Sequence, residues 1–299
     1  MPSISVTLDG PASPGLTLAP WRRGGYDPAN RITPDGAIWR TSAMKSGPVS
    51  ARITKSAPDT VDCEAWGPGS AEFLDGFGAL MGVDDDSGQF HPVDPTIAEA
   101  HRRVPHLSLG RSGLVLEALV PAVIEQRVSG MDAWRAWRRL VTKYGAPAPG
   151  PAPEGMRVPP TAEVWRRIPS WEFHRANVDP GRARTIVGCA QRADALERLT
   201  AERAVTALRS LPGVGEWTAA ETVQRAFGDA DAISVGDYHL ATMIGRTLLG
   251  HPIDDAAMVD LLEPLRPHRQ RAVRLLEASG LAHNPRFGAR SAIPNLRAL

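Results

Sequence analysis

The sequence of 299 residues contains only two cysteines, Cys63 and Cys189, and it has no long apolar stretch. Two cysteines so far apart exclude a disulfide framework and a cysteine-based zinc site, and we expect both to be reduced thiols. The longest apolar run with few charges, at 114–124, is about half as long as a membrane-spanning helix needs. The first ten residues lack a basic segment that leads into an apolar one, so we expect a cytoplasmic protein without a membrane span.

Lysine is also scarce beyond residue 100, where Lys143 is the only one. Residues 1–100 carry 7 Lys and Arg against 13 Asp and Glu, a balance of −6, and residues 101–299 carry 27 against 20, a balance of +7. Arginine suits bidentate contacts with phosphate, but a genome rich in G and C favours arginine as well. The charge distribution therefore permits nucleic-acid binding without establishing it.

The first hundred residues have the pattern of an antiparallel sheet. Short, partly alternating segments rich in Ile, Val, Thr and Trp are separated by Gly and Pro, at 37–44, 49–56 and 60–67. A helix is predicted over 70–82. The acidic run Asp84, Asp85 and Asp86, with His91 nearby, lacks a recognisable metal-ligand spacing and favours a solvated loop.

From about residue 101 onward the pattern becomes helical. Helices are predicted at 112–127, 131–144, 161–169, 181–191, 193–209, 216–227, 237–249, 255–263 and 267–279. The proline-rich segment 146–160 excludes a helix or a central strand and predicts a surface loop between helices. Trp134 and Trp137 stand three residues apart in one predicted helix, and we expect both to face a core rather than a ligand.

The stretch LPGVG at 211–215 breaks otherwise continuous helical sequence and predicts a helix-hairpin-helix. Pro212 and Gly213 make the turn, and Gly215 lets the backbone come close to a partner where the second helix begins. The amides at that helix start are unpaired, so they form an anion site that suits a phosphate. A packed helical corner is the alternative explanation for this motif alone.

Asp237 follows Gly236 at the start of the next predicted helix, 22 residues after Gly215. An isolated aspartate there is ordinarily a helix N-cap. A hairpin followed by a Gly/Pro-rich loop and an aspartate at this distance resembles the helix-hairpin-helix superfamily of DNA glycosylases. The segment 116–145, with a Gln-x-Val-Ser turn between two helices, is similar to the branch of 3-methyladenine DNA glycosylase II. The resemblance is strong over 112–280 and weak before residue 100.

This resemblance implies a mainly helical fold, in which an N-terminal antiparallel β domain precedes two helical subdomains that flank a DNA cleft. The accessory α+β domain is expected at 1–100. The central helical subdomain, which holds the hairpin, is expected at 126–228. The C-terminal helical subdomain is expected to be discontinuous, at 101–125 and 229–299.

The resemblance also implies a chemistry. Asp237 is expected to be the catalytic carboxylate, which stabilises the oxocarbenium-like sugar and activates a water after the base has flipped out of the duplex. Relatives that also cut the strand carry a lysine where this sequence has Trp217, so a monofunctional glycosylase without lyase activity is expected. Cationic alkylated purines need no general acid and stack on aromatic faces such as Trp217. No iron-sulfur cluster is expected, because no cysteine follows Cys189.

Further residues receive roles from the same resemblance. Substrate binding is expected from Trp217, Glu221, Tyr238 and Gln126. DNA binding is expected from Arg127, Gly213, Val214, Gly215 and Thr218. A structural Na+ or K+ is expected on the backbone carbonyls of Arg209, Leu211 and Val214. The partner is expected to be double-stranded DNA, bound by a monomer.

Several alternatives stay open at this stage. The substrate could be a deaminated base, or the chain could bind DNA lesions without turnover. Arg127, where relatives insert an apolar wedge, could stack into the gap left by the flipped base, contact a phosphate, or be a plain surface residue. Glu221, four residues after Trp217, could favour a cationic base in the pocket or pair with Arg225 at the helix surface.

Overall fold

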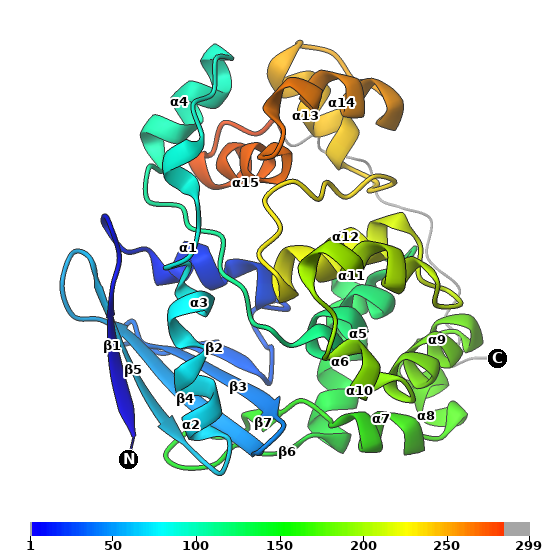
Figure 1. Cartoon of the computed structure of the whole chain (residues 1–299). Coiled ribbons are helices and arrows are strands. Elements are labelled where there is room, and N and C mark those ends of the chain that lie inside the picture. The colour runs from blue at the N-terminus through cyan, green and yellow to red at the C-terminus, as the bar shows by residue number, and fades with distance from the viewer. Residues whose placement is uncertain (1, 284–299) are drawn as a thin grey trace.

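The computed structural model describes residues 2–283 of the chain, in which an antiparallel sheet is followed by two groups of helices (Figure 1). The five strands lie in the order β1-β5-β4-β3-β2. Their bounds are β1 Ser3–Thr7, β2 Asn30–Ile32, β3 Ile38–Met44, β4 Gly47–Lys55 and β5 Thr60–Trp66. This arrangement confirms the predicted fold class, a mainly helical protein with an N-terminal antiparallel sheet.

The sheet forms because alternate residues of its strands are apolar. In β5, Val61, Cys63 and Ala65 are fully buried, while the residues between them are half-buried. The buried side chains pack against short helices: α1 Pro14–Leu18, η1 Ala19–Trp21, α2 Ser70–Asp75 and α3 Phe77–Met81. The helix predicted over 70–82 is therefore broken into α2 and α3, and the break lies at Gly76.

The remaining helices follow the predicted pattern with three differences. The segment predicted as one helix at 193–209 is divided, because the chain turns between Glu197 and Thr200. Two helices, α4 and α8, were not predicted. The bounds are η2 Ser87–Gln89, α4 Pro95–Arg103, α5 Val115–Glu125, α6 Gly130–Tyr144, α7 Ala162–Arg167, α8 Ser170–Arg175, α9 Pro180–Ala190, α10 Ala193–Leu196, α11 Ala201–Arg209, α12 Glu216–Ala226, α13 Leu240–Leu248, α14 Asp255–Leu262, η3 Glu263–Leu265 and α15 Arg269–Ser279.

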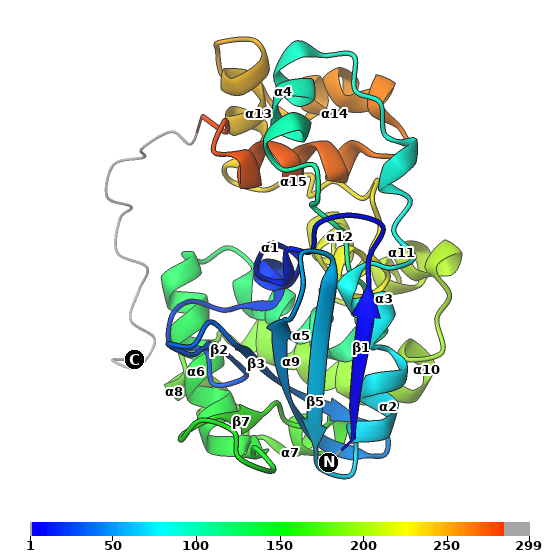
Figure 2. The same ribbon diagram turned by 90° about the vertical axis from the view of Figure 1, so that its left-hand side faces the viewer.

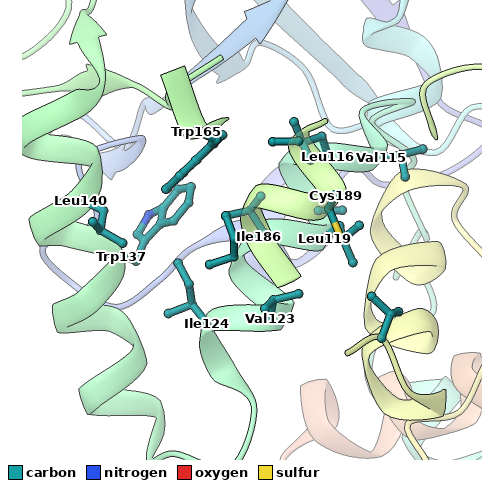
Figure 3. Packing of buried hydrophobic residues seen from close by; sticks show 14 of the residues in the cluster. Val115, Leu116, Leu119, Val123, Ile124, Trp137, Leu140, Trp165, Ile186 and Cys189 are labelled. Atoms are coloured by element: carbon teal, nitrogen blue, oxygen red, sulfur yellow. The ribbon is translucent and has the colours of Figure 1, made fainter. Parts of the chain in front are cut away.

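Two hydrophobic clusters hold the helices together. The central cluster contains buried side chains of α5, α6, α9 and α12, with Ile124, Trp137 and Ile186 among them (Figure 3). The distal cluster joins α4 to α13, α14 and α15 through Ile97, Met243 and Leu276. Figure 2 shows the distal helices as a separate group above the sheet and the central helices.

The helix α5 belongs to the central cluster, because Leu119, Val123 and Ile124 are buried against α9 and α12. The domain prediction assigned residues 101–125 to the C-terminal helical subdomain. The packing of α5 favours the central subdomain instead. The segments that pack in the distal cluster lie at 90–107 and 233–276. We propose that the central helical subdomain begins with α5 and that the discontinuous subdomain begins with α4.

The acidic segment at 84–86 is a loop, as predicted, in which Asp84 and Asp86 are about half exposed but the Asp85 side chain is buried. Asp85 forms an ion pair with Arg271 of α15, and its side chain is only 5% exposed. Asp84 pairs with Arg111 at 2.5 Å. The run is therefore a link between the N-terminal part of the chain and α15. Asp85 is buried because Arg271 neutralises it.

The proline-rich segment 146–160 contains no helix, as predicted, but it forms a small hairpin of β6 Ala146–Pro147 and β7 Arg157–Val158. The Thr41 hydroxyl donates to the Arg157 carbonyl at 2.6 Å, so the hairpin is docked onto the sheet. Within residues 2–283, none of the helices has both the length and the apolar character that a bilayer crossing requires.

Candidate active site

The turn between α11 and α12 has the predicted helix-hairpin-helix geometry. Gly213 adopts a φ of 85°, in the left-handed region that only glycine enters freely. A Cβ atom on Gly213 would lie 2.0 Å from the Thr185 hydroxyl oxygen of α9, so this glycine is needed for packing as well as for the turn. Gly215 caps the N-terminus of α12, and a Cβ there would meet nothing within 4 Å. The side of the turn at Gly215 is therefore open to a partner.

Gln126 fixes the position of this turn relative to α5. Its side-chain amide donates to the Gly213 carbonyl at 2.9 Å and to the Thr218 hydroxyl at 2.7 Å. Thr218 is only 2% exposed, and its hydroxyl is occupied by this hydrogen bond. Both residues lie at the predicted interface, and Gln126 braces the hairpin there.

Asp237 is held by three hydrogen bonds. One carboxylate oxygen accepts from the backbone N–H groups of His239 at 2.8 Å and Leu240 at 3.0 Å, just before α13. The other oxygen accepts from the indole N–H of Trp217 at 3.2 Å. The two backbone bonds resemble those of the helix N-cap that an isolated aspartate ordinarily forms, but α13 begins at Leu240 and its N-cap residue is His239. The carboxylate is half-buried and oriented on both sides.

A cleft of about 910 Å³ opens beside Asp237. It lies between the α5–α6 turn and the loop that precedes α13, and it brings together Gln126, Arg127, Trp217, Glu221, Asp237 and Tyr238, all of them predicted site residues. Tyr238 is 58% exposed at its edge. Arg127, at the tip of the α5–α6 turn, is exposed and has a φ of 56°. The cleft therefore combines a carboxylate with aromatic and cationic side chains.

Trp134 is a residue of this cleft that the sequence reasoning assigned to the core. Trp137 is buried, as predicted, and its indole N–H donates to Asp27 at 2.9 Å. Trp134 is 40% exposed and lines the cleft instead. The buried stripe of α6 runs through Ala133, Ala136 and Trp137, so Trp134 lies at its margin. The positions of the two tryptophans relative to the buried residues of this helix therefore distinguish them: Trp137 belongs to the buried face and Trp134 does not.

A second cavity of about 380 Å³, here called the recess, adjoins the cleft. Asp237, Glu221 and Trp134 line both. The recess is also bounded by the N-terminal segment at 16–23 and by α15, so it is made from three distant parts of the sequence. No motif in a single segment indicates such a cavity.

Glu221 lies in the recess and is paired. Its carboxylate accepts from Arg225 at 2.8 Å and from the Ser234 hydroxyl at 2.5 Å. Burial raises the pKa of Glu221, but Arg225, Ser234 and Arg23 outweigh burial and hold that pKa below its usual value. The predicted pairing with Arg225 is confirmed, but it is buried rather than on the helix surface. Because Arg225 neutralises the carboxylate, Glu221 is not a free negative charge that would favour a cationic base.

A groove of about 1220 Å³ runs along the open side of the hairpin. We call it the arginine groove, because its lining includes Arg127, Arg182, Arg184 and Arg192 as well as residues 211–218. Arg182 is buried and donates to the Ile124 carbonyl at 2.5 Å, whereas Arg184 is exposed. The lining also includes Asp179, which pairs with Arg182, and Glu216, and Gly215 at the start of α12 lies in the same groove.

Within residues 2–283, no group of three or more His, Cys, Asp or Glu side chains is arranged to hold a metal ion. The predicted cation site uses backbone carbonyls instead. Of these, the Leu211 carbonyl accepts from the Val214 N–H at 3.1 Å and keeps a second lone pair.

Comparisons with known proteins give a curated relative and several solved structures of similar fold. No family model matches the chain. The chain is 31% identical over 267 residues to the probable bifunctional transcriptional activator/DNA repair enzyme AlkA of Mycobacterium tuberculosis. The matched region covers 81% of this chain and 50% of that protein. The chain therefore spans about half the length of this curated relative.

The fold is shared with several solved structures. A 3-methyladenine DNA glycosylase from Archaeoglobus fulgidus superposes with a TM-score of 0.73 at 17% identity, over 93% of this chain and 98% of that one. The apo form of an 8-oxoguanine glycosylase/lyase from Clostridium acetobutylicum gives 0.70 at 14% identity, over 93% and 96%. The structure of MBOgg1 in complex with a low-affinity DNA ligand gives 0.74 at 15% identity, over 93% and 95%.

Proposed function

We propose that the chain is a monofunctional DNA glycosylase, because it belongs to the helix-hairpin-helix DNA glycosylase superfamily. It has the fold of these enzymes, and AlkA is a curated relative. The chain excises damaged bases from double-stranded DNA, and the name of the Archaeoglobus fulgidus structure, a 3-methyladenine DNA glycosylase, supports alkylated purines as the class of base. We further propose that it acts as a monomer in the cytoplasm and needs no cofactor for the reaction.

The observation that carries this proposal is the position of Asp237. The carboxylate lies in a cleft beside Trp217, and the same cleft reaches Arg127, which also lines the arginine groove. A duplex held at the hairpin can therefore place one flipped nucleotide at Asp237. As the N-glycosidic bond breaks, the carboxylate stabilises the positive charge on the sugar and takes a proton from the attacking water. Trp217 and Trp134 offer faces on which a cationic purine can stack.

The experiment that tests this function is incubation of the purified chain with duplexes that carry single lesions, followed by measurement of released base and of abasic sites. Release of an alkylated purine with an intact abasic strand is the expected result. Binding without release would make the chain a non-catalytic lesion binder.

Borohydride trapping should give no covalent adduct, because Trp217 cannot form a Schiff base. A trapped adduct would contradict the monofunctional assignment.

Replacement of Arg127 by alanine should weaken binding to an abasic duplex about tenfold and binding to single-stranded DNA much less. The reason is that only the duplex has a gap into which a guanidinium at the tip of the turn can stack. Titration of both DNA forms measures the difference. Arg184→Ala is the matched control, since an exposed arginine of the same groove should affect both forms equally. Equal losses for Arg127→Ala would reduce it to a phosphate contact.

The two hairpin glycines should respond differently to alanine. Gly213→Ala should lower the thermal unfolding temperature, because a positive φ costs about 1–2 kcal/mol and the new Cβ would collide with Thr185. Gly215→Ala should lower stability less than Gly213→Ala, because its methyl group meets no atom and alanine is only a poorer N-cap than glycine. It should lower duplex affinity about tenfold, because that methyl group projects into the open space that a phosphate would use. Unchanged affinity of the Gly215 variant would exclude close approach at this position.

We also propose the monovalent cation at the hairpin. The carbonyls of Arg209, Leu211 and Val214 belong to the end of α11 and the turn before α12, and an ion held by them would join the hairpin to a DNA phosphate. Duplex affinity should then fall when Na+ and K+ are replaced by a large organic cation at constant ionic strength. An affinity that depends on ionic strength alone would remove the ion from the proposal.

A further inference from the structure

We propose that a second DNA-binding surface lies on the exposed side of α6, beyond the cleft as seen from the hairpin. We call it the α6 face, and it consists of Tyr26, Met131, Arg135 and Arg138. Its ligand is the phosphate backbone of the duplex flank that lies on the other side of the flipped nucleotide. This inference rests on the proposed function and gives the N-terminal segment a part in DNA binding.

Exposed apolar and cationic side chains are interleaved on this face. Met131, Arg135 and Arg138 follow one another at spacings of four and three residues, so they lie on the same side of α6. Met131 is 60% exposed and the Arg135 side chain 57% exposed. Tyr26 is 81% exposed, and the Arg138 guanidinium lies over its ring, 5.6 Å from the centroid. Aromatic and cationic side chains arranged in this way are typical of surfaces that bind nucleic acid.

A fixed loop of the N-terminal segment holds Tyr26 in its exposed position. The neighbouring Asp27 is only 2% exposed, and its carboxylate accepts from the Trp137 indole N–H of α6 at 2.9 Å. Gly24 has a φ of 76°, and a Cβ on it would lie 2.7 Å from the Trp134 ring, so the loop backbone lies against that ring. Because the loop is anchored on α6 at both points, presenting the tyrosine to a ligand costs little further ordering.

Arg138 supplies the uncompensated charge of the α6 face. Among the ion pairs within residues 2–283, α6 contributes Arg135, which pairs with Asp132, and Lys143, which pairs with Glu172, and none of these pairs includes Arg138. A guanidinium that stacks on an exposed ring and has no carboxylate partner is complementary to a phosphate, which it can bind through two oxygens.

The α6 face is continuous with the cleft that contains Asp237. Trp134 stands one turn before Arg138 and lines the cleft but not the arginine groove, whereas Arg127 lines both. The order across the surface is therefore arginine groove, cleft and α6 face. A duplex bound at the hairpin would extend over this face beyond the flipped nucleotide. At 1.5 Å per residue, Arg138 lies about 12 Å along α6 from Gly130, which equals the rise of about three to four base pairs.

Arg138→Gln should weaken binding to a duplex with a central abasic site about fivefold. The slope of log affinity against log salt concentration should become shallower by about 0.9, because one phosphate contact is lost. Tyr26→Ala should weaken binding about threefold and leave the slope unchanged, because it removes the ring below the guanidinium but no charge. Arg139→Gln is the matched control, since this exposed arginine lies about 100° around α6 from Arg138. Thermal unfolding verifies that all variants fold.

Duplexes with neutral linkages locate the contact. Methylphosphonates replace the phosphates three to five steps from the abasic site, on one side of that site in the first duplex and on the other side in the second. This replacement removes charge and keeps base pairing. The loss of affinity caused by Arg138→Gln should disappear on one of the two duplexes and persist on the other, because only one flank lies on the α6 face.

The outcomes separate this inference from the proposed function. Unchanged affinity of Arg138→Gln, a loss equal to that of Arg139→Gln, or a loss that persists on both neutralised duplexes would overturn the α6 face as a DNA-binding surface. The glycosylase assignment would then stand, provided that the unmodified chain binds the abasic duplex and releases damaged bases. An unmodified chain that does neither would overturn the proposed function, and the inference with it.

Discussion

Replacement of Asp237 by asparagine is expected to reduce base release by at least about a hundredfold, while affinity for duplex DNA stays the same or increases. Asparagine still has a side-chain oxygen that can accept from the His239 and Leu240 N–H groups, so the local backbone should be preserved. What is lost is the negative charge beside the sugar. Loss of a negative charge near the DNA backbone also reduces repulsion of phosphates.

Asp254→Asn provides a matched control for this experiment. Asp254 caps α14, where its carboxylate accepts from the Ala257 N–H at 2.9 Å, and it does not line the cleft, the recess or the arginine groove. The control variant should retain full activity. Single-turnover release of base from a lesion duplex, together with titration of an abasic duplex, measures both properties. Near-normal turnover of Asp237→Asn would make the carboxylate a helix cap and nothing more.

Replacement of Glu221 by glutamine is expected to lower the free energy of unfolding by about 2–3 kcal/mol, because Arg225 and Arg23 would lose the negative charge that balances them in a buried position. The melting temperature should fall by about 5–10 °C. Glu263→Gln is the control: Glu263 also pairs with arginines but is 53% exposed, so its loss should change stability little. A similar small change for both variants would show that the recess network does not stabilise the fold.

The effect of Glu221 should depend on pH. Its pKa is lower in the folded protein than in the unfolded chain, so the ionised carboxylate favours folding. This contribution is fully present above the unfolded value of about 4.3 and is lost as the pH falls through the folded value. The stability difference between the protein and Glu221→Gln should therefore be constant near neutral pH and shrink in acid. A difference that grows in acid would contradict the direction of the pKa change.

The same variant also addresses substrate charge. Because Arg225 neutralises Glu221, excision of cationic and neutral bases should change in parallel in Glu221→Gln. A selective loss of activity on cationic bases would instead restore the hypothesis, made from the sequence, that Glu221 attracts them.

The parts of the fold that the sequence predicted are those with a local cause. Strands β3, β4 and β5 follow from alternation of apolar residues, and the hairpin follows from Gly213 and Gly215 between two amphipathic helices. The break between α10 and α11 was missed, because its residues carry no strong helix-breaking signal apart from the capping position of Thr200.

The candidate site also contains residues that could be predicted and a cavity that could not. The roles of Asp237 and Trp217 were expected from the family resemblance, and in the structure the Trp217 indole N–H donates to the Asp237 carboxylate at 3.2 Å. The recess was not predicted, because its contacts join residues that are distant in the sequence. The Arg225 guanidinium donates to the Pro20 carbonyl at 2.9 Å, across a separation of 205 residues. Neither helical periodicity nor a motif encodes a contact of that kind.

Together with the ion pairs Arg23–Glu125 and Arg271–Asp85, the hydrogen bond from Arg225 to Pro20 makes the site rigid. Each of these buried contacts joins the N-terminal part of the chain to one of the helical groups, so the segments around Asp237 are held in fixed positions. Closure of these segments on a substrate would break contacts that are buried away from water. Under the proposed function, we therefore expect the deformation that exposes a base to Asp237 to fall on the double helix, and sites where the duplex already bends or unpairs easily to be attacked first.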